Sequence, residues 1–433
     1  MTTWYAQNGS QNIDAAWNGH DTMWNDAADG SGNWLTWSSL GSSDVLNANG
    51  KTAIAINVDV TCDTIKTGTG TGDTAGGGFT VAAARTMNCD VLAGTTTCVT
   101  DTCSSGTHVI NGDITGGSVS GSPSAWTKSG NCNMTITGNL TGGVRPAAYG
   151  IALSSANTSG VIQVTGNVTG GAGSGANGIM LSGTGPVTID GNLTNGATSY
   201  AVQMGVDASL TVNGDVIGGA YAGVYLTNGT VTVNEGSIYS TSSAKAISCA
   251  SLGDVVLNAC SVGNNGVEIT GTGCSLTLTN TCEVAPTNAI GISLAAAITA
   301  NMSANITGGS ASGCVGVMCS SGSSVLNITG NVTGGTGAEG IKANAATNLP
   351  TINVTGNVTG GSGGVGISNV FGGVTTITGN IVDTANYAAV MASKLRMVPG
   401  SENYHRVYTG SVYEDLMIAS EGGGGGDAFT WLG

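Results

Sequence analysis

The stretch Thr165-Gly166-Asn167-Val168-Thr169-Gly170-Gly171 decides the fold, because the same seven residues return at Thr355 to Gly361. Near copies carry a glycine followed by Asn or Asp, at Gly138-Asn139, Gly191-Asn192, Gly214-Asp215, Gly330-Asn331 and Gly379-Asn380. The phrase recurs about every 24 residues, a period typical of repeat proteins in which each unit buries its apolar face against its neighbours. The sequence therefore predicts a stack of coils and not a fold with one compact core.

Three neighbouring columns of the repeat can be followed along the chain. The first holds only Gly, Ala or Cys, including Cys62, Cys89, Cys260 and Cys282, and we expect a tight inward corner there. The second is mostly Asn or Asp, whose stacked side chains can form a hydrogen-bonded ladder. The third is aliphatic, so Val168, Leu193 and Val216 are expected to lie over one another in the interior.

Two further strands repeat in phase with these columns. One begins with a small residue before a β-branched one, as in Gly150-Ile151 and Gly178-Ile179. The other alternates strictly, as in Thr135-Ile136-Thr137, which is the period of a half-buried strand. Three short strands per coil predict an all-β parallel β-helix (solenoid) of about 14 rungs of about 24 residues. Right-handed winding is expected from the handedness of parallel crossovers.

The rungs near Gly236, Cys260 and Cys282 carry one extra residue before the corner, which predicts a bulge or an altered corner there. The repeat sets the expected domains. Residues 1–50 form a Trp-rich N-terminal cap or anchor, residues 51–393 form the parallel β-helix, and residues 394–433 form a C-terminal segment with a Gly-rich linker and an aromatic tail.

The two ends differ in composition from the repeats. Bulky aromatic side chains suit either a cap over the open apolar end of a solenoid or an anchor onto a partner protein, and the sequence leaves both open. After five glycines, Gly422 to Gly426, the aromatic tail suits docking on a neighbour or on the solenoid itself. The candidate capping or assembly residues are Trp4, Trp17, Trp24, Trp34, Trp37, Phe429 and Trp431.

Composition excludes several classes of function. The chain has 74 Gly and 8% charged residues, and its formal net charge of −15 disfavours binding to nucleic acid. The chain has no run of about 20 apolar residues, so we expect no membrane-spanning segment. The start at Met1 to Tyr5 lacks the pattern of a secretory signal, which argues against a secreted adhesin.

Eleven cysteines are present, and the expectation is that they are buried, reduced thiols packed as small apolar groups. Cys98–Cys103 and Cys314–Cys319 are the pairs that we would test for a disulfide. The chain has neither a CxxC pair nor a cluster of histidines, so we expect no metal and no cofactor.

An enzyme site was sought among the acidic residues, because glycoside hydrolysis needs two facing carboxylates. The nearest constellation is an outward stack of Asp190, Asn213 and Glu235, which is more typical of a solvated ladder. His20, His108 and His405 lie far apart in sequence and offer no nucleophile–base pair. The sequence therefore predicts a protein that is not an enzyme, with no catalytic residues.

A resemblance to a known family rests on the opening of the chain. Thr3-Trp4-Tyr5-Ala6-Gln7-Asn8-Gly9, Trp34-Leu35-Thr36-Trp37 and Asp44-Val45-Leu46 precede the Thr/Val-rich rungs. This opening and the style of the repeat resemble β-solenoid structural proteins of tailed-bacteriophage virions. The resemblance implies a fibre, spike or capsid decoration on the virion surface, assembled in the host cytoplasm. It also implies a homo-oligomer, with a trimer favoured, whose partners are other virion proteins and, as a further candidate, a host surface glycan.

Two alternatives remain open. One is a bacterial cell-surface adhesin or filament subunit, with an extracellular location. The other is a polysaccharide-degrading tailspike, against which the missing pair of carboxylates argues. The leading hypothesis is a non-enzymatic structural or receptor-binding virion protein.

Overall fold

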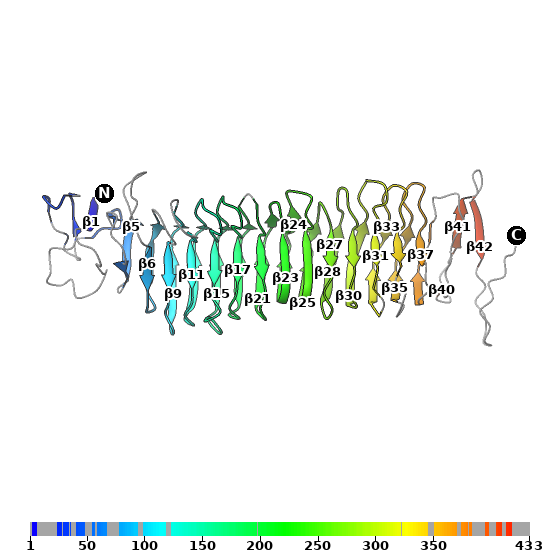
Figure 1. The fold of residues 1–433 in the computed structure, drawn as a ribbon, viewed down its shortest axis with the longest axis horizontal. Helices are drawn as coiled ribbons and strands as arrows, with labels where there is room; N and C mark the ends of the chain where they lie inside the picture. The colour runs from blue at the N-terminus through cyan, green and yellow to red at the C-terminus, as the bar shows by residue number, and fades with distance from the viewer. Residues whose placement is uncertain are drawn as a thin grey trace. The chain divides into compact units, whose positions relative to one another are not determined.

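The structure is a computed structural model. It describes residues 2–6, 24–27, 29–33, 35, 40–47, 54–56, 59–66, 78–93, 98–117, 123–196, 198–321, 323–344, 350–369, 374–379, 381–382, 395–397, 404–408 and 413–417. The chain divides into two compact units, Met1–Tyr221 and Ala222–Gly433. Within each unit, successive coils lie side by side (Figure 1). The predicted fold class is confirmed: the protein is an all-β parallel β-solenoid with about 24 residues per turn. It has about 12 turns, fewer than the 14 or so that the repeat predicted.

Each coil of the first unit contributes strands to three parallel sheets, called sheets 1, 2 and 3 in the order in which a coil enters them. Sheet 1 contains β4 (Ile54–Ala55), β6 (Phe79–Val81), β8 (Val99–Asp101), β11 (Trp126–Lys128), β14 (Ile151–Leu153), β17 (Ile179–Leu181) and β20 (Val202–Met204). Sheet 2 contains β9 (Thr107–Asn111), β12 (Asn133–Thr137), β15 (Ile162–Thr165), β18 (Val187–Asp190) and β21 (Ser209–Asn213). Sheet 3 contains β1 (Thr3–Ala6), β3 (Val45–Asn47), β10 (Ile114–Thr115), β13 (Leu140–Thr141), β16 (Val168–Thr169), β19 (Leu193–Thr194) and β22 (Val216–Gly218). The longer strands β5 (Val60–Lys66) and β7 (Thr86–Leu92) run through sheets 2 and 3, and β2 (Trp24–Asn25) pairs antiparallel with β1.

The second unit is built in the same way. Sheet 1 contains β27 (Val267–Ile269), β29 (Ile292–Leu294), β31 (Val317–Cys319), β34 (Ile341–Ala343) and β37 (Ile367–Asn369). Sheet 2 contains β32 (Val325–Thr329), β35 (Thr351–Thr355), β38 (Val374–Thr378) and β40 (Leu395–Met397). Sheet 3 contains β24 (Ser237–Ser240), β26 (Ser261–Val262), β33 (Val332–Thr333), β36 (Val358–Thr359), β39 (Ile381–Val382) and β41 (Tyr404–Tyr408). Strands β23 (Val224–Asn234) and β25 (Ile247–Asn258) run through sheets 1 and 2, β28 (Ser275–Val284) and β30 (Thr299–Thr307) run through sheets 2 and 3, and β42 (Tyr413–Met417) pairs antiparallel with β41.

The interior columns predicted from the repeat are confirmed. Val168 pairs in register with Leu193, Leu193 pairs with Val216, and all three are fully buried. In sheet 1, Ile151 likewise lies beside Ile179. A buried aliphatic side chain of this size contributes about 1.5–3 kcal/mol relative to an exposed one. Because each coil adds the same inward residues, stability comes from neighbouring coils and not from one central core.

The polar column forms a ladder, as predicted, and the ladder runs from side chain to backbone. The backbone N–H of Asn167 donates to Asn139 Oδ1 at 2.9 Å, and that of Asn192 donates to Asn167 Oδ1 at 2.9 Å. The N–H of Asn139 donates in the same way to Asp113 Oδ1 at 2.7 Å. Since the column requires only an accepting oxygen, Asp and Asn are interchangeable in it.

The corner column, in which the repeat has Gly, Ala or Cys, contains two different local structures. The sequence analysis treated them as one. At Gly138 and Gly356 the strand breaks, the residue is half-buried with φ of 152° and 144°, and an added Cβ would lie 2.2 or 2.1 Å from the carbonyl oxygen of the preceding coil. At Cys62, Cys89 and Ala304 the strand continues through the corner, and the side chain points inward and is buried. The expected inward corner is therefore correct only for the Cys and Ala members.

The altered corners predicted near Gly236, Cys260 and Cys282 are confirmed. Glu235, Ala259 and Asn280 precede these corners with φ of 56°, 54° and 55°. A left-handed residue accommodates the extra residue while the inward residues keep their register, as Val262 does with Val284.

Candidate metal centre

A cluster of polar side chains lies in the interior of the first unit, where the chain passes from sheet 1 to sheet 2. Strand β8 ends at Asp101 and β11 ends at Lys128, and both residues face inward because each strand alternates buried, half-buried, buried. Parallel pairing places Lys128 in register with Asp101. Opposite charges at one inward position of consecutive coils therefore meet inside the solenoid.

Asp101 and Lys128 form an ion pair that is shielded from solvent. Lys128 Nζ donates to Asp101 Oδ2 at 2.8 Å, and neither side chain is exposed. Asp101 Oδ1 accepts from the backbone N–H of Cys103 at 2.8 Å and lies 3.2 Å from His108 Nε2. Burial alone would raise the pKa of Asp101, but the hydrogen bonds from His108 and Lys128 outweigh it and lower that pKa. Asp101 is thus a carboxylate held by these three donors, and the thiol of Cys132 donates to it more weakly, at 3.7 Å from Oδ2.

The protonation of His108 follows from its neighbours. The backbone N–H of Arg85 can only donate, and it lies 3.1 Å from His108 Nδ1. Nδ1 therefore accepts, and the ring proton is on Nε2, where it is donated to Asp101. The ring meets Trp126 edge-on, with centroids 6.2 Å apart. His108 is accordingly a neutral imidazole with both nitrogens in use.

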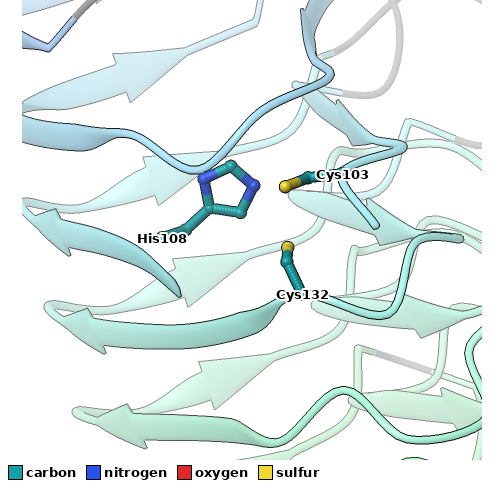
Figure 2. Close-up of side chains that lie close together, drawn as sticks. All are labelled: Cys103, His108 and Cys132. Atoms are coloured by element: carbon teal, nitrogen blue, oxygen red, sulfur yellow. The ribbon is translucent and has the colours of Figure 1, made fainter. Parts of the chain in front are cut away.

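Two thiols complete the cluster. The sulfurs of Cys103 and Cys132 and a ring nitrogen of His108 all lie within 4.8 Å of one another, and all three residues are buried. Figure 2 shows the sulfur of Cys103 directed toward the ring of His108 and the sulfur of Cys132 directed toward that of Cys103. Lys128 Nζ donates to Cys132 Sγ at 3.0 Å, and Cys103 Sγ donates to the carbonyl of Ser105 at 3.1 Å.

The thiol of Cys132 is protonated at neutral pH. Burial raises its pKa to about 12, the charge of Asp101 adds to this, and the hydrogen bond from Lys128 opposes it. A metal ion that bound here would displace thiol protons, because thiolate is the ligand form. The cluster can therefore offer two sulfurs to a soft metal ion beside an ion pair that orients its neighbours.

The expectation of no metal missed this cluster because it was tested against linear motifs. Cys103 and Cys132 come from consecutive coils, and Asp101 and Lys128 are separated by 27 residues, about one coil. The sequence did contain one signal of a buried polar cluster, since Asp101 and Lys128 have opposite charges and occupy inward positions one coil apart. The register that brings the two cysteines together was not visible in the sequence.

The aromatic residues singled out at the ends are only partly described. Trp4 is buried in β1, and its indole N–H donates to Asp44 Oδ2 at 3.3 Å. Trp24 begins β2. The others lie outside the described residues: Trp17, Trp34, Trp37, Phe429 and Trp431. Their capping or assembly role remains a prediction.

All eleven cysteines are buried, as expected. The two pairs chosen for a disulfide are badly placed, because β8 separates Cys98 from Cys103 and β31 occupies the chain up to Cys319. Three extended residues span about 10 Å, whereas bridged Cα atoms lie about 4.4–6.8 Å apart, and all four cysteines are free thiols. Closeness in sequence was therefore the wrong criterion for pairing.

The outward acidic stack is a ladder in the structure. Asn213 Nδ2 donates to Asp190 Oδ1 at 2.5 Å on an exposed face. Glu235 does not continue this column, because it is the left-handed extra residue, and its neighbour Asn234 pairs in register with Asn258.

Comparison with known proteins adds one similarity. No curated protein and no solved structure matched the chain. Residues 92–260, which include the whole Cys103–His108–Cys132 cluster, match the model of a family described as periplasmic copper-binding protein (NosD).

Proposed function

We propose that this protein is a non-enzymatic β-solenoid whose outer faces serve as a structural or receptor-binding surface. The observation that carries the proposal is that outward-facing side chains of successive coils, exposed or half-buried, are hydrogen-bonded to one another. Asn327 Nδ2 donates to Asn301 Oδ1 and Asn353 Nδ2 to Asn327 Oδ1, each at 2.9 Å. Such ladders fix a repeating polar surface at little further entropic cost on binding, which suits assembly and recognition.

The finer proposal is a component of a bacteriophage virion surface, such as a fibre, spike or capsid decoration. It is supported by the resemblance of the Trp-rich opening to virion solenoids. A homotrimer, other virion proteins and a host surface glycan are the proposed partners. The cell-surface adhesin and the polysaccharide-degrading tailspike are the alternatives, and the description of the matched family as periplasmic adds a further location outside the cytoplasm.

The test uses the full chain. Light scattering measures its native mass, and reducing-sugar release from host capsule measures cleavage. The proposal expects a trimer, binding to virions or host cells, and no sugar release. A strict monomer that binds neither would overturn it, and so would sugar release that Asp190→Asn abolishes.

A second candidate function is copper binding, favoured because the matched segment contains the buried sulfur cluster. The residues fit a soft ion such as Cu(I), for which thiolates are preferred ligands. Cys103 and Cys132 would hold it, and the ammonium of Lys128, already bonded to Cys132 Sγ, favours thiolate there. Both ring nitrogens of His108 are engaged, so we assign it to positioning through Asp101. The protein would then store Cu(I) in a form that can be exchanged with other ligands.

Copper binding is tested by competing the reduced full chain against a colorimetric Cu(I) chelator without oxygen. Cys103→Ser with Cys132→Ser is expected to weaken binding by about 10-fold or more. Cys249→Ser with Cys274→Ser is the matched control, because it also removes two buried thiols that are in contact. Equal effects of the two double variants would rule out a specific site, as would a wild type that fails to compete.

A further inference from the structure

A second pair of cysteines meets between consecutive coils of the second unit. Cys249 lies in β25, in register with Ile269 of the next coil, and Cys274 lies just before β28. Their sulfurs are 2.9 Å apart, and the side chains are 0% and 3% exposed. The contact joins residues 25 apart in the chain.

The backbone around Cys249 directs its sulfur toward the next coil. The thiol donates to the carbonyl of Gly253 at 3.4 Å, and Cys274 donates to the carbonyl of Ser251. A Cβ at Gly253 would lie 2.8 Å from Cys249 Sγ, so the bend of the chain where β25 passes from sheet 1 to sheet 2, marked by a register shift after Cys249, lies close around the thiol. The two sulfurs therefore converge from staggered positions across this bend.

The stagger matters for covalent bonding. Residues in register on neighbouring parallel strands are held about 4.8 Å apart, and their side chains run alongside each other. Cβ atoms in a disulfide are about 3.5–4.5 Å apart and point toward each other. Cys260 and Cys282 are an in-register pair, since Ser261 pairs with Glu283, and they provide an internal comparison. Cys249 and Cys274 are free of this constraint.

We propose that Cys249 and Cys274 are a redox-controlled cross-linking site that forms a disulfide between consecutive coils. The oxidant is a small-molecule disulfide such as oxidised glutathione. One thiolate attacks it, releasing one glutathione thiolate and leaving a mixed disulfide. The second cysteine thiolate attacks the mixed disulfide, forms the Cys249–Cys274 bond and releases the second glutathione. The two cysteine protons pass to the two glutathione thiolates, and two electrons leave the protein.

The reaction is slow in the folded state and depends on pH. Burial raises the pKa of Cys249 to about 12, and the hydrogen bond and charge of Cys274 add to the shift. Little Cys249 thiolate exists at neutral pH, so its attack proceeds faster at alkaline pH or while the coil is open during folding. A chain folded in an oxidising compartment would carry the bond, and one kept in a reducing cytoplasm would not.

The test refolds the full chain with reduced and oxidised glutathione, then alkylates it under denaturing conditions and maps its peptides. We expect nine of the eleven cysteines to be alkylated and one cross-linked peptide joining Cys249 to Cys274. Cys260 and Cys282 are expected to remain free thiols and therefore to be alkylated. Reduction should restore all eleven sites and lower the melting temperature by about 5 °C.

Two variants test whether the cross-link is specific to Cys249 and Cys274. Cys274→Ser should leave Cys249 alkylated, whereas Cys314→Ser should leave the cross-link intact. If a variant fails to fold, the wild-type peptide map alone decides. Full alkylation of the oxidised wild type would overturn the proposal, and so would a bond that joins any other pair, including Cys260 to Cys282.

Discussion

The pairs Cys103–Cys132 and Cys249–Cys274 are built alike and surrounded differently. Each joins two buried thiols from consecutive coils. The first lies beside Lys128, which donates to Cys132 Sγ at 3.0 Å and is itself paired with Asp101. The second lies among backbone carbonyls, including that of Gly253.

The difference shows that the surroundings, more than the sulfurs, set the chemistry of a buried cysteine pair. An ammonium group stabilises a nearby thiolate, which is the form that binds a metal ion. Carbonyl oxygens accept from neutral thiols and give a thiolate no support, so the uncharged disulfide is the better product there. The following predictions test this contrast, from the largest expected effect to the smallest.

The largest effect is expected from Lys128→Met, which leaves the carboxylate of Asp101 buried without its cation. Breaking such a pair costs about 3–5 kcal/mol of unfolding free energy. Lys342→Met is the matched control, because its pair with Glu339 is partly exposed and is worth about 1 kcal/mol or less. Urea unfolding followed by circular dichroism measures both. Similar losses in the two variants would contradict the view of Asp101–Lys128 as a shielded pair.

Gly253→Ala is expected to disturb the second pair without touching the first. The added Cβ would lie 2.6 Å from the side chain of Leu226 and 2.8 Å from Cys249 Sγ. Overpacking of this kind costs about 1–3 kcal/mol, and displacement of the sulfur should reduce the yield of the Cys249–Cys274 cross-link. Peptide mapping after oxidation gives the yield, and an unchanged yield would argue against the role of the bend.

Acid should weaken the first cluster selectively. The folded-state pKa of Asp101 is lowered, so its contribution to stability is present above the unfolded pKa near 3.8 and is lost as pH falls through the folded value. The stability difference between wild type and Asp101→Asn should therefore shrink below about pH 4. The difference between wild type and Cys249→Ser should stay constant over the same range. Urea midpoints measured at several pH values would separate these outcomes.

The smallest effect is expected from Trp126→Phe, beside His108. Within the described part of the chain the buried indole N–H of Trp126 has no hydrogen-bond partner. Phe removes this unsatisfied donor and also some packing, so the two changes offset each other to within about 1 kcal/mol. A loss of several kcal/mol in thermal or urea unfolding would contradict this balance.

Much of the fold could be predicted from the sequence. The period, the inward column of Val168, Leu193 and Val216, and the altered corners before Cys260 and Cys282 all follow from side-chain patterns that each coil repeats. The corner column was only partly correct, because glycine at a backbone contact and cysteine facing inward are both small. Composition cannot separate a residue that lacks a side chain from one that buries a small one.

The sequence by itself determined that this chain winds into stacked coils with an aliphatic interior and polar ladders outside, since these depend on local alternation repeated about every 24 residues. Only the tertiary structure decided which cysteines and charges meet. Cys98 and Cys103 are close in sequence but lie at opposite ends of a strand, whereas Cys249 and Cys274 are 25 residues apart and touch. Contacts between coils depend on register and on the length of every intervening turn, and these turns vary from coil to coil.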